Sequence, residues 1–256
     1  KEFLLVEGSV EIFDIEGNVL VTDKATYDKI NELITTFDAT EIKLNNGYNV
    51  KSNNIIYNTE AKIVSSNLET ILTDADGNIV NVSMFQYQVT QNLFSSVGNI
   101  KVVDNKNNKY FFKELHIDTK KKEMIGSDVS VLLDQKNFGV KPENDPRFVS
   151  NDVYVTEGKT QMTKGVFTVC KKRDGKCPPW SLKAKKITHD KLKKTIYYKH
   201  ATLKFYDVPI FYFPAFFHPD PTVERKSGFL NPFFSNSNSL GSGFGVPYFW
   251  AIDRDR

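Results

Sequence analysis

Few residues in the chain have a type and spacing suited to catalysis. His189 and Asp190 are neighbours in sequence, but on a strand adjacent side chains point to opposite faces and do not form an acid–base dyad. The run from Asp74 to Asn78 resembles the start of a calcium loop, yet the later glutamate is missing, so we interpret it as a turn. The sequence lacks G-x-S-x-G, H-E-x-x-H and glycine-rich phosphate loops. We therefore predict no enzyme activity, no metal site and no cofactor.

The two cysteines, Cys170 and Cys177, flank a turn-rich insert. Two cysteines without a nearby histidine make a poor zinc site, because tetrahedral zinc takes four ligands. The spacing favours a local disulfide between them, which would indicate an oxidising compartment. Two free thiols are the alternative.

A thirty-residue sequence unit is repeated four times between Val10 and Met124. Turn residues mark the copies at Gly17, Gly47, Gly77 and Asn107, and a fixed period of this size is typical of repeat architectures. The apolar positions keep the same spacing in five columns: Ile12, Ile42, Leu72 and Val102; Leu20, Val50, Val80 and Tyr110; Ala25, Ile55, Phe85 and Leu115; Tyr27, Tyr57, Tyr87 and Ile117; Ile34, Val64, Phe94 and Met124.

Alternation of apolar and polar residues within each unit predicts strands. In the first copy we expect strands near 9–13, 19–28 and 31–37. The columns should stack into an all-β fold, a β-solenoid or elongated β-jelly roll, with a long apolar seam. Beyond the repeat we expect strands at 129–133, 147–155, 161–170, 180–189 and 195–206, with a loop insertion at 137–147.

The composition changes after residue 207. Four prolines punctuate the aromatic stretch that follows, at Pro209, Pro214, Pro219 and Pro221, and proline does not fit a central strand. We therefore divide the chain into 1–207, a jelly roll; 208–227, a rigid proline-rich linker; and 228–256, which carries two further strands near 228–235 and 244–252.

Charge and hydropathy narrow the class of protein. The formal net charge is only +3, which argues against a dedicated nucleic-acid binder. The lysine runs at 120–122 and 183–186 are interpreted as solvated edges and turns, with contact to phosphorylated lipid as the alternative. The sequence contains no run of about 18 apolar residues, so we predict no transmembrane helix. Because the first residue is Lys1, we expect a fragment from which an export signal has been removed.

The segment from 178 to 252 carries a family likeness. Pro178-Pro179-Trp180, the run Lys183–Ile187, the run Tyr206–Pro214, the run His218–Val223, Ser227-Gly228-Phe229 and the run Gly245–Ile252 resemble the signature stretch of the LPS-assembly outer-membrane family LptD (OstA family). The thirty-residue repeat is similar to the periplasmic β-jelly roll of that pathway.

The resemblance implies a function and partners. It implies a jelly roll that receives lipopolysaccharide and the first two strands of an outer-membrane β-barrel, with this portion mostly periplasmic. It also implies an LptA-type bridge protein at the N-terminal edge and an LptE-type lipoprotein with the full barrel. Pro232 and Pro247 would be the prolines that weaken pairing at a lateral gate. Members of the family join jelly roll to barrel by disulfides, whereas both cysteines here lie in the jelly roll.

The physical requirement of such transport is a shielded apolar track for acyl chains. The candidates for that groove are inward-facing column residues: Ile12, Ile42, Leu72, Val102, Ile55, Phe85, Leu115, Tyr57, Tyr87, Ile34, Val64, Phe94 and Met124. Each of them taken singly is equally at home in a plain core. Two alternatives stay open: a carbohydrate-active β-solenoid enzyme, which would need a carboxylate cluster on one face, and a structural scaffold.

Overall fold

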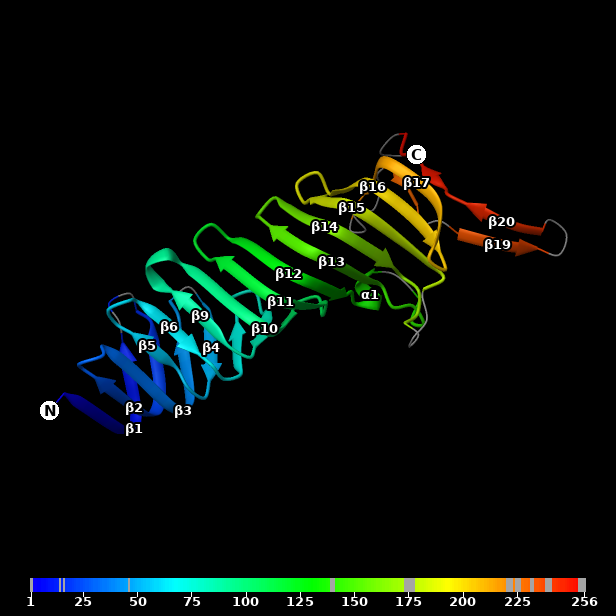
Figure 1. Cartoon of the computed structure of the whole chain (residues 1–256). Helices are drawn as coiled ribbons and strands as arrows, with labels where there is room; N and C mark the ends of the chain where they lie inside the picture. The colour runs from blue at the N-terminus through cyan, green and yellow to red at the C-terminus, as the bar shows by residue number, and fades with distance from the viewer. Residues whose placement is uncertain are drawn as a thin grey trace.

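The fold is an elongated β-jelly roll whose termini lie at opposite ends (Figure 1). The computed structural model describes residues 2–13, 15, 17–45, 47–138, 141–172, 178–219, 223, 227–230, 233–237 and 241–252. Seventeen strands form one antiparallel sheet, and two short pairs follow it. The elements are β1 (Phe3–Phe13), β2 (Val19–Asp28), β3 (Leu33–Lys43), β4 (Asn49–Ser52), β5 (Ile56–Asn58), β6 (Ile63–Ser66), β7 (Thr70–Thr73), β8 (Ile79–Val82), β9 (Phe85–Gln88), η1 (Val89–Gln91), β10 (Leu93–Val103), β11 (Lys109–Asp118), β12 (Glu123–Leu132), α1 (Gln135–Phe138), β13 (Arg147–Val155), β14 (Lys159–Thr168), β15 (Trp180–Asp190), β16 (Thr195–Phe205), β17 (Val208–Pro219), β18 (Gly228–Phe229), β19 (Phe233–Ser237), β20 (Gly241–Gly245) and β21 (Tyr248–Phe249).

One thirty-residue unit corresponds to two strands rather than three. The predicted strand at 31–37 continues through Asp38 into the start of the next copy, and the two form the single strand β3. The expected separate third strand was therefore wrong for the first copy, whereas in the second copy β6 and β7 are separate strands on either side of the bend.

These bends fold the sheet lengthwise into two walls. Gly8, Asp38, Gly98 and Asp128 all take positive φ, at 104°, 62°, 108° and 50°. The spacing between these positions is always a multiple of thirty residues. We call wall A the half of each strand that leads to the turns at Gly17, Gly47 and Gly77 and their later equivalents. Wall B is the half that leads to the opposite turns, such as that at Glu32. Register shifts fall beside the bend in β1 and β10, as expected for bulges, which bend strands.

The inner faces of the two walls share one core. Buried side chains of wall A such as Val82 and Ile100 belong to the same apolar cluster as Phe85 and Leu115 of wall B. In the first repeats the line between the walls is filled by small hydroxyl residues. Thr40 Oγ1 donates to Thr36 Oγ1 at 2.8 Å, and both residues are buried, so their hydroxyls satisfy one another where water is excluded.

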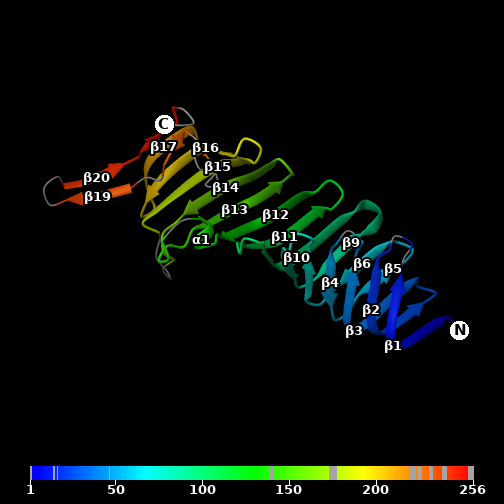
Figure 2. The same ribbon diagram turned by 180° about the vertical axis from the view of Figure 1, so that it is seen from behind.

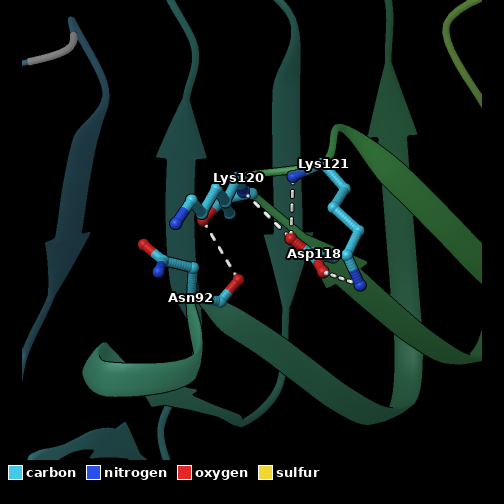
Figure 3. Close-up of polar contacts among 5 residues, drawn as sticks. Asn92, Asp118, Lys120 and Lys121 are labelled. Carbon is cyan, nitrogen blue, oxygen red and sulfur yellow. Dashed lines mark hydrogen bonds and ion pairs between the residues drawn. The ribbon is translucent and has the colours of Figure 1, made fainter.

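The turns of wall B are tied to one another along the long axis. The backbone N–H of Thr119 donates to the carbonyl of Asn92 at 2.9 Å, and Thr59 makes the same bond to Glu32 two repeats earlier, at 2.8 Å. Within the turn, Asp118 Oδ1 accepts from the backbone N–H groups of Lys120 and Lys121 at 3.1 and 2.8 Å (Figure 3). Such Asx turns set the loop geometry locally, and Asp28 closes the turn of the first copy in the same way.

The segment expected to be a linker is mostly strand. Residues 208–219 form β17, which pairs with β16 along its length, so the predicted linker was wrong over this range. Proline is tolerated here because β17 is the last strand of the sheet and one of its edges has no ladder partner in the described chain. The loop insertion predicted at 137–147 overlaps the single-turn helix α1.

The C-terminal residues form a hairpin and a short strand pair. β19 pairs with β20, and β18 pairs with β21, so both predicted terminal strands are interrupted. The β19–β20 hairpin extends beyond the end of the sheet (Figure 2), and the ring of Phe244 stacks on Phe211 of β17 at 5.6 Å. Pro232 lies outside the described residues, and so does Cys177. The disulfide expected between Cys170 and Cys177 stays a prediction.

Candidate functional site: a continuous apolar interior

Wall A carries an unbroken apolar row through the repeat. The strand register places each residue opposite the next, so the two predicted columns interleave into one line. The line runs Ile12, Leu20, Ile42, Val50, Leu72, Val80, Val102 and Tyr110. Directly opposite side chains in an antiparallel pair are close enough to touch, so this row is one continuous apolar surface.

Wall B carries a matching row that faces wall A across the core. Its register is equally regular, and it runs Tyr27, Ile34, Tyr57, Val64, Tyr87, Phe94, Ile117 and Met124. The column residues that belong to the buried core cluster or pack against it are Ile42, Val50, Ile55, Val64, Leu72, Val80, Phe85, Tyr87, Phe94, Val102, Tyr110, Leu115, Ile117 and Met124. Whether these residues contact lipid stays a prediction.

Burial divides the interior into a filled centre and an accessible flank. Ile55, Phe85 and Leu115 are 2%, 5% and 0% exposed, and Phe85 stacks on Phe94 with ring centroids 5.8 Å apart. Ile55, Phe85 and Leu115 fill the core beside the bend, and Phe94, in the wall B row, is buried against them. The other candidates are half-buried and lie nearer the turns: Ile12, Ile42, Leu72, Val102, Tyr57, Tyr87, Ile34, Val64 and Met124. Any apolar ligand would meet this second group first.

At its C-terminal end the interior opens into an apolar cavity of about 110 Å³. The lining comes from four strands of the sheet, β14 to β17, and from the C-terminal segment: Phe167, Trp180, Leu182, Tyr198, Leu203, Phe213, Phe216, His218, Leu230 and Val246. Leu230 and Val246 belong to the C-terminal segment, so the cavity lies where the jelly roll meets that segment. A concave, largely apolar site with few polar groups is the usual form of a ligand pocket.

The polar part of the cavity wall comes from Tyr198 and His218, and Phe216 packs against the tyrosine ring. The rings of Tyr198 and Phe216 stack with centroids 4.4 Å apart. Tyr198 Oη and His218 Nε2 are 2.9 Å apart and share a hydrogen bond. Burial raises the pKa of Tyr198, because the phenolate would be poorly solvated. The tyrosine therefore stays neutral and presents its ring to the cavity.

Sequence reasoning missed this cavity. Phe213, Phe216 and His218 lie on β17, which was taken as a linker, and the alternation that puts them on the inner face is broken by Pro214. Trp180 and Leu182 were recognised as strand residues, but the weak repeat after Met124 gave no column to place them in.

The carboxylates considered for chemistry serve turns. Asp74 Oδ1 accepts the backbone N–H groups of Asp76 and Asn78 at 2.9 and 2.8 Å, which confirms the turn interpretation. Asp190 Oδ1 accepts the N–H of Lys193 at 3.0 Å, and this bond lowers the pKa of Asp190. His189 and Asp190 occupy successive positions of β15 and so face opposite sides.

Two further observations bear on cofactors and membranes. Within the described ranges no three His, Cys, Asp or Glu side chains are grouped to hold a metal ion. None of the helices in those ranges has the length and hydropathy needed to cross a membrane.

Comparison with known proteins places the chain among relatives. No family model matches it. The LPS-assembly protein LptD of Hahella chejuensis is 34% identical over 144 residues, which cover 54% of this chain and 17% of that protein. LptD of Nitrosomonas europaea is 32% identical over 43% of this chain and 16% of its own length. The resemblance to LptD is confirmed.

The LptD match covers only part of both chains. LptD of Pasteurella multocida is 30% identical over 51% of this chain, and the chain spans 17% of that protein's length. Among solved structures, the LptA-homologous periplasmic protein LptH of Pseudomonas aeruginosa aligns with 43% of this chain and 80% of its own, at 16% identity and a TM-score of 0.37.

Proposed function

We propose that this chain carries lipopolysaccharide along its apolar interior, as the periplasmic portion of an LptD-like outer-membrane assembly protein. The observation that carries the proposal is the pair of unbroken apolar rows, which run from β1 to β11 on wall A and from β2 to β12 on wall B. The cavity beneath the C-terminal segment lies at the far end of the same interior. Similarity to proteins named for LPS assembly supports this assignment.

The free energy of burying acyl chains is compatible with a lipid that moves along the interior. Each methylene buried from water contributes about 0.8 kcal/mol, so several acyl chains would be held firmly in total. Because neighbouring positions in each row are alike in size and polarity, moving one repeat along the axis exchanges similar contacts. Direction has to come from outside the chain, since the sequence has no nucleotide-binding loop.

The N-terminal edge fits a bridge protein of the LptA type. β1 pairs with β2 on one side, and its apolar residues Phe3, Leu4 and Leu5 are 57%, 58% and 48% exposed. An open apolar edge strand is a template for adding a strand from another chain. A bridge protein docked there would extend both apolar rows.

The C-terminal segment fits the start of a barrel. In this proposal residues 228–256 begin an outer-membrane β-barrel that works with an LptE-type lipoprotein. The carbonyl of Pro247 accepts the N–H of Leu230 at 2.9 Å, but proline has no N–H to donate. Pairing beside it is correspondingly weaker, which supports a role at a lateral gate together with Pro232.

Site-specific photocrosslinking tests the lipid path. A photoreactive residue is placed at Leu72, Tyr87 or Met124, which are half-buried on the inner faces. Lys51 and Asn81 are the matched controls, because the register puts them on the outer face, each opposite Ile71. Adducts with purified lipopolysaccharide at the inner positions and none at the controls would support the proposal.

Two other outcomes would contradict it. Equal labelling of inner and outer positions would indicate surface adsorption. No labelling at all, in folded protein with saturating lipid, would leave the rows as core and favour a scaffold.

A further inference from the structure

Charge is unevenly distributed along the convex ridge where the strands bend. Over β3, β12 and β13 the ridge carries Asp38, Asp128 and Asp152. Over β14, β15 and β16 it carries Lys164, Lys185, Lys186 and Lys199, all exposed. We call these four residues the lysine ridge.

The register brings the lysine ridge together. Lys186 of β15 lies directly opposite Lys199 of β16. Lys164 and Lys185 occupy the bend between the registered pairs of β14 and β15, and His200 occupies the bend of β16. Like charges directly opposite in a sheet destabilise the pairing, so the cluster is costly unless something negative neutralises it.

No carboxylate in the described part of the chain forms an ion pair with these four lysines. Asp152 lies on the neighbouring strand β13, opposite Thr163, the residue before Lys164, and its Oδ2 accepts a hydrogen bond from the Thr163 hydroxyl at 2.7 Å. The positive charge of the ridge is therefore turned toward solvent.

The backbone at the bend adds to the cost. Lys164 and His200 have φ of 51° and 50°, whereas Gly8 and Gly98 occupy bends in earlier strands. Left-handed backbone favours glycine, asparagine and aspartate over long side chains. Lys164 thus stands at a position where the backbone alone would favour a smaller residue.

Aromatic side chains border the ridge on the same outer face. Tyr197 and Phe217 lie opposite each other with ring centroids 6.0 Å apart, and they are 37% and 46% exposed. Tyr212, 58% exposed, shares a hydrogen bond of 2.6 Å with His200 Nδ1. Lysine beside exposed tyrosine and phenylalanine is the composition of surfaces that lie at a lipid headgroup layer.

We propose that the lysine ridge and its aromatic border bind the anionic phospholipid headgroups of a bilayer leaflet. This inference rests on the proposed function, in which the C-terminal end of the jelly roll is the end nearest the outer membrane. The surface would hold β14–β17 against the leaflet and so fix the tilt of the long axis. Charge complementarity selects phosphate-bearing lipid, because a neutral surface offers nothing to the lysines.

Vesicle flotation tests the proposal with the full chain. The chain is mixed with vesicles of phosphatidylcholine alone or with added phosphatidylglycerol, and bound protein is measured over a range of salt. Lys185→Gln/Lys186→Gln/Lys199→Gln is compared with Lys51→Gln/Lys101→Gln/Lys109→Gln. The second variant removes the same charge from exposed lysines of β4, β10 and β11 that lie away from the bend.

The ridge variant should bind anionic vesicles about tenfold or more weakly, while the matched control stays close to the unaltered chain. Arginine at the same three ridge positions should restore binding. Equal loss in both glutamine variants would overturn the proposal, because net charge alone would explain it. No preference for anionic over neutral vesicles would overturn it too.

A parallel measurement separates this inference from the proposed function. Crosslinking of lipopolysaccharide at Leu72 should be unchanged in the ridge variant. If crosslinking fails in the unaltered chain while vesicle binding persists, the transport proposal fails and the membrane surface stands. If the ridge variant loses lipopolysaccharide but keeps vesicle binding, the lysines serve the cargo and the surface proposal fails.

Discussion

The ring of Phe112 on wall A occupies the space that a side chain at Gly126 on wall B would need. A Cβ atom at Gly126 would lie 2.6 Å from Phe112 Cδ1, and both residues are buried. At Gly165 on wall A, a Cβ atom would lie 2.6 Å from Ile187 Cδ1 on wall B and 2.8 Å from Phe148 Cζ on the same wall. In the C-terminal half, side chains of one wall thus pack directly against a glycine of the other.

Gly126→Val should destabilise the protein, because the new methyl groups and the ring of Phe112 cannot occupy the same space. Overpacking of this kind costs about 1–3 kcal/mol, measurable by urea unfolding. Gly158→Ala is the control, since a Cβ there would lie 3.7 Å from Leu192 Cδ1, an ordinary contact. A Gly126→Val protein as stable as the control would show that the ring can move aside.

The turn at Gly77 should tolerate asparagine better than alanine. Gly77 has φ of 82° with open space around it, and Asn107 takes the equivalent place with φ of 63°. Alanine in this conformation costs about 1–2 kcal/mol, and asparagine costs less because it adopts left-handed backbone more readily. Thermal unfolding of the two variants gives the order, and alanine equal to asparagine would contradict the argument.

The free energy of unfolding should fall in acid, because the carboxylates that close the wall B turns become protonated. The backbone hydrogen bond from Lys121 is the main cause of the lowered pKa of Asp118, and the bond from the Asn31 side chain lowers that of Asp28. A lowered pKa in the folded state means that the stabilisation is complete above the unfolded value, near about 3.9, and is lost as pH falls through the folded value.

Asp118→Asn isolates one of these contributions. Its deficit relative to the unaltered chain should be largest at neutral pH and should shrink as pH is lowered below the unfolded value. Urea midpoints at a series of pH values measure the difference. A deficit that does not change with pH would mean that the charge of Asp118 contributes nothing.

Val246→Trp should obstruct the C-terminal cavity. Val246 lines the cavity and is 41% exposed, so a larger side chain can enter the cavity with little damage to the core. With the cavity filled, a photoreactive residue at Leu182 should capture less lipopolysaccharide, while capture at Leu72 stays. Ile252→Trp, at a position that is 75% exposed, is the control. Unchanged capture at Leu182 in Val246→Trp would remove the cavity from the lipid path.

The rows were predictable because one period of the sequence equals two strands of the sheet. Residues thirty apart, such as Ile42 and Leu72, therefore lie two strands apart on one face. The bends were not predictable, since Asp38 and Lys164 take left-handed backbone without glycine to signal it. Prolines misled the assignment of β17, because edge strands accept residues that central strands exclude.

The lengthwise bend also bears on mechanics. In the described chain every ladder of backbone hydrogen bonds joins neighbouring strands within one wall. β10, for example, pairs with β8 on wall A and with β9 on wall B. The bend is therefore a crease parallel to the long axis, and the angle between the walls can widen at the expense of side-chain contacts alone. We therefore expect the molecule to resist stretching along its axis more than a change in the angle between its walls, and under the proposed function that angle would adapt to the width of the bound lipid.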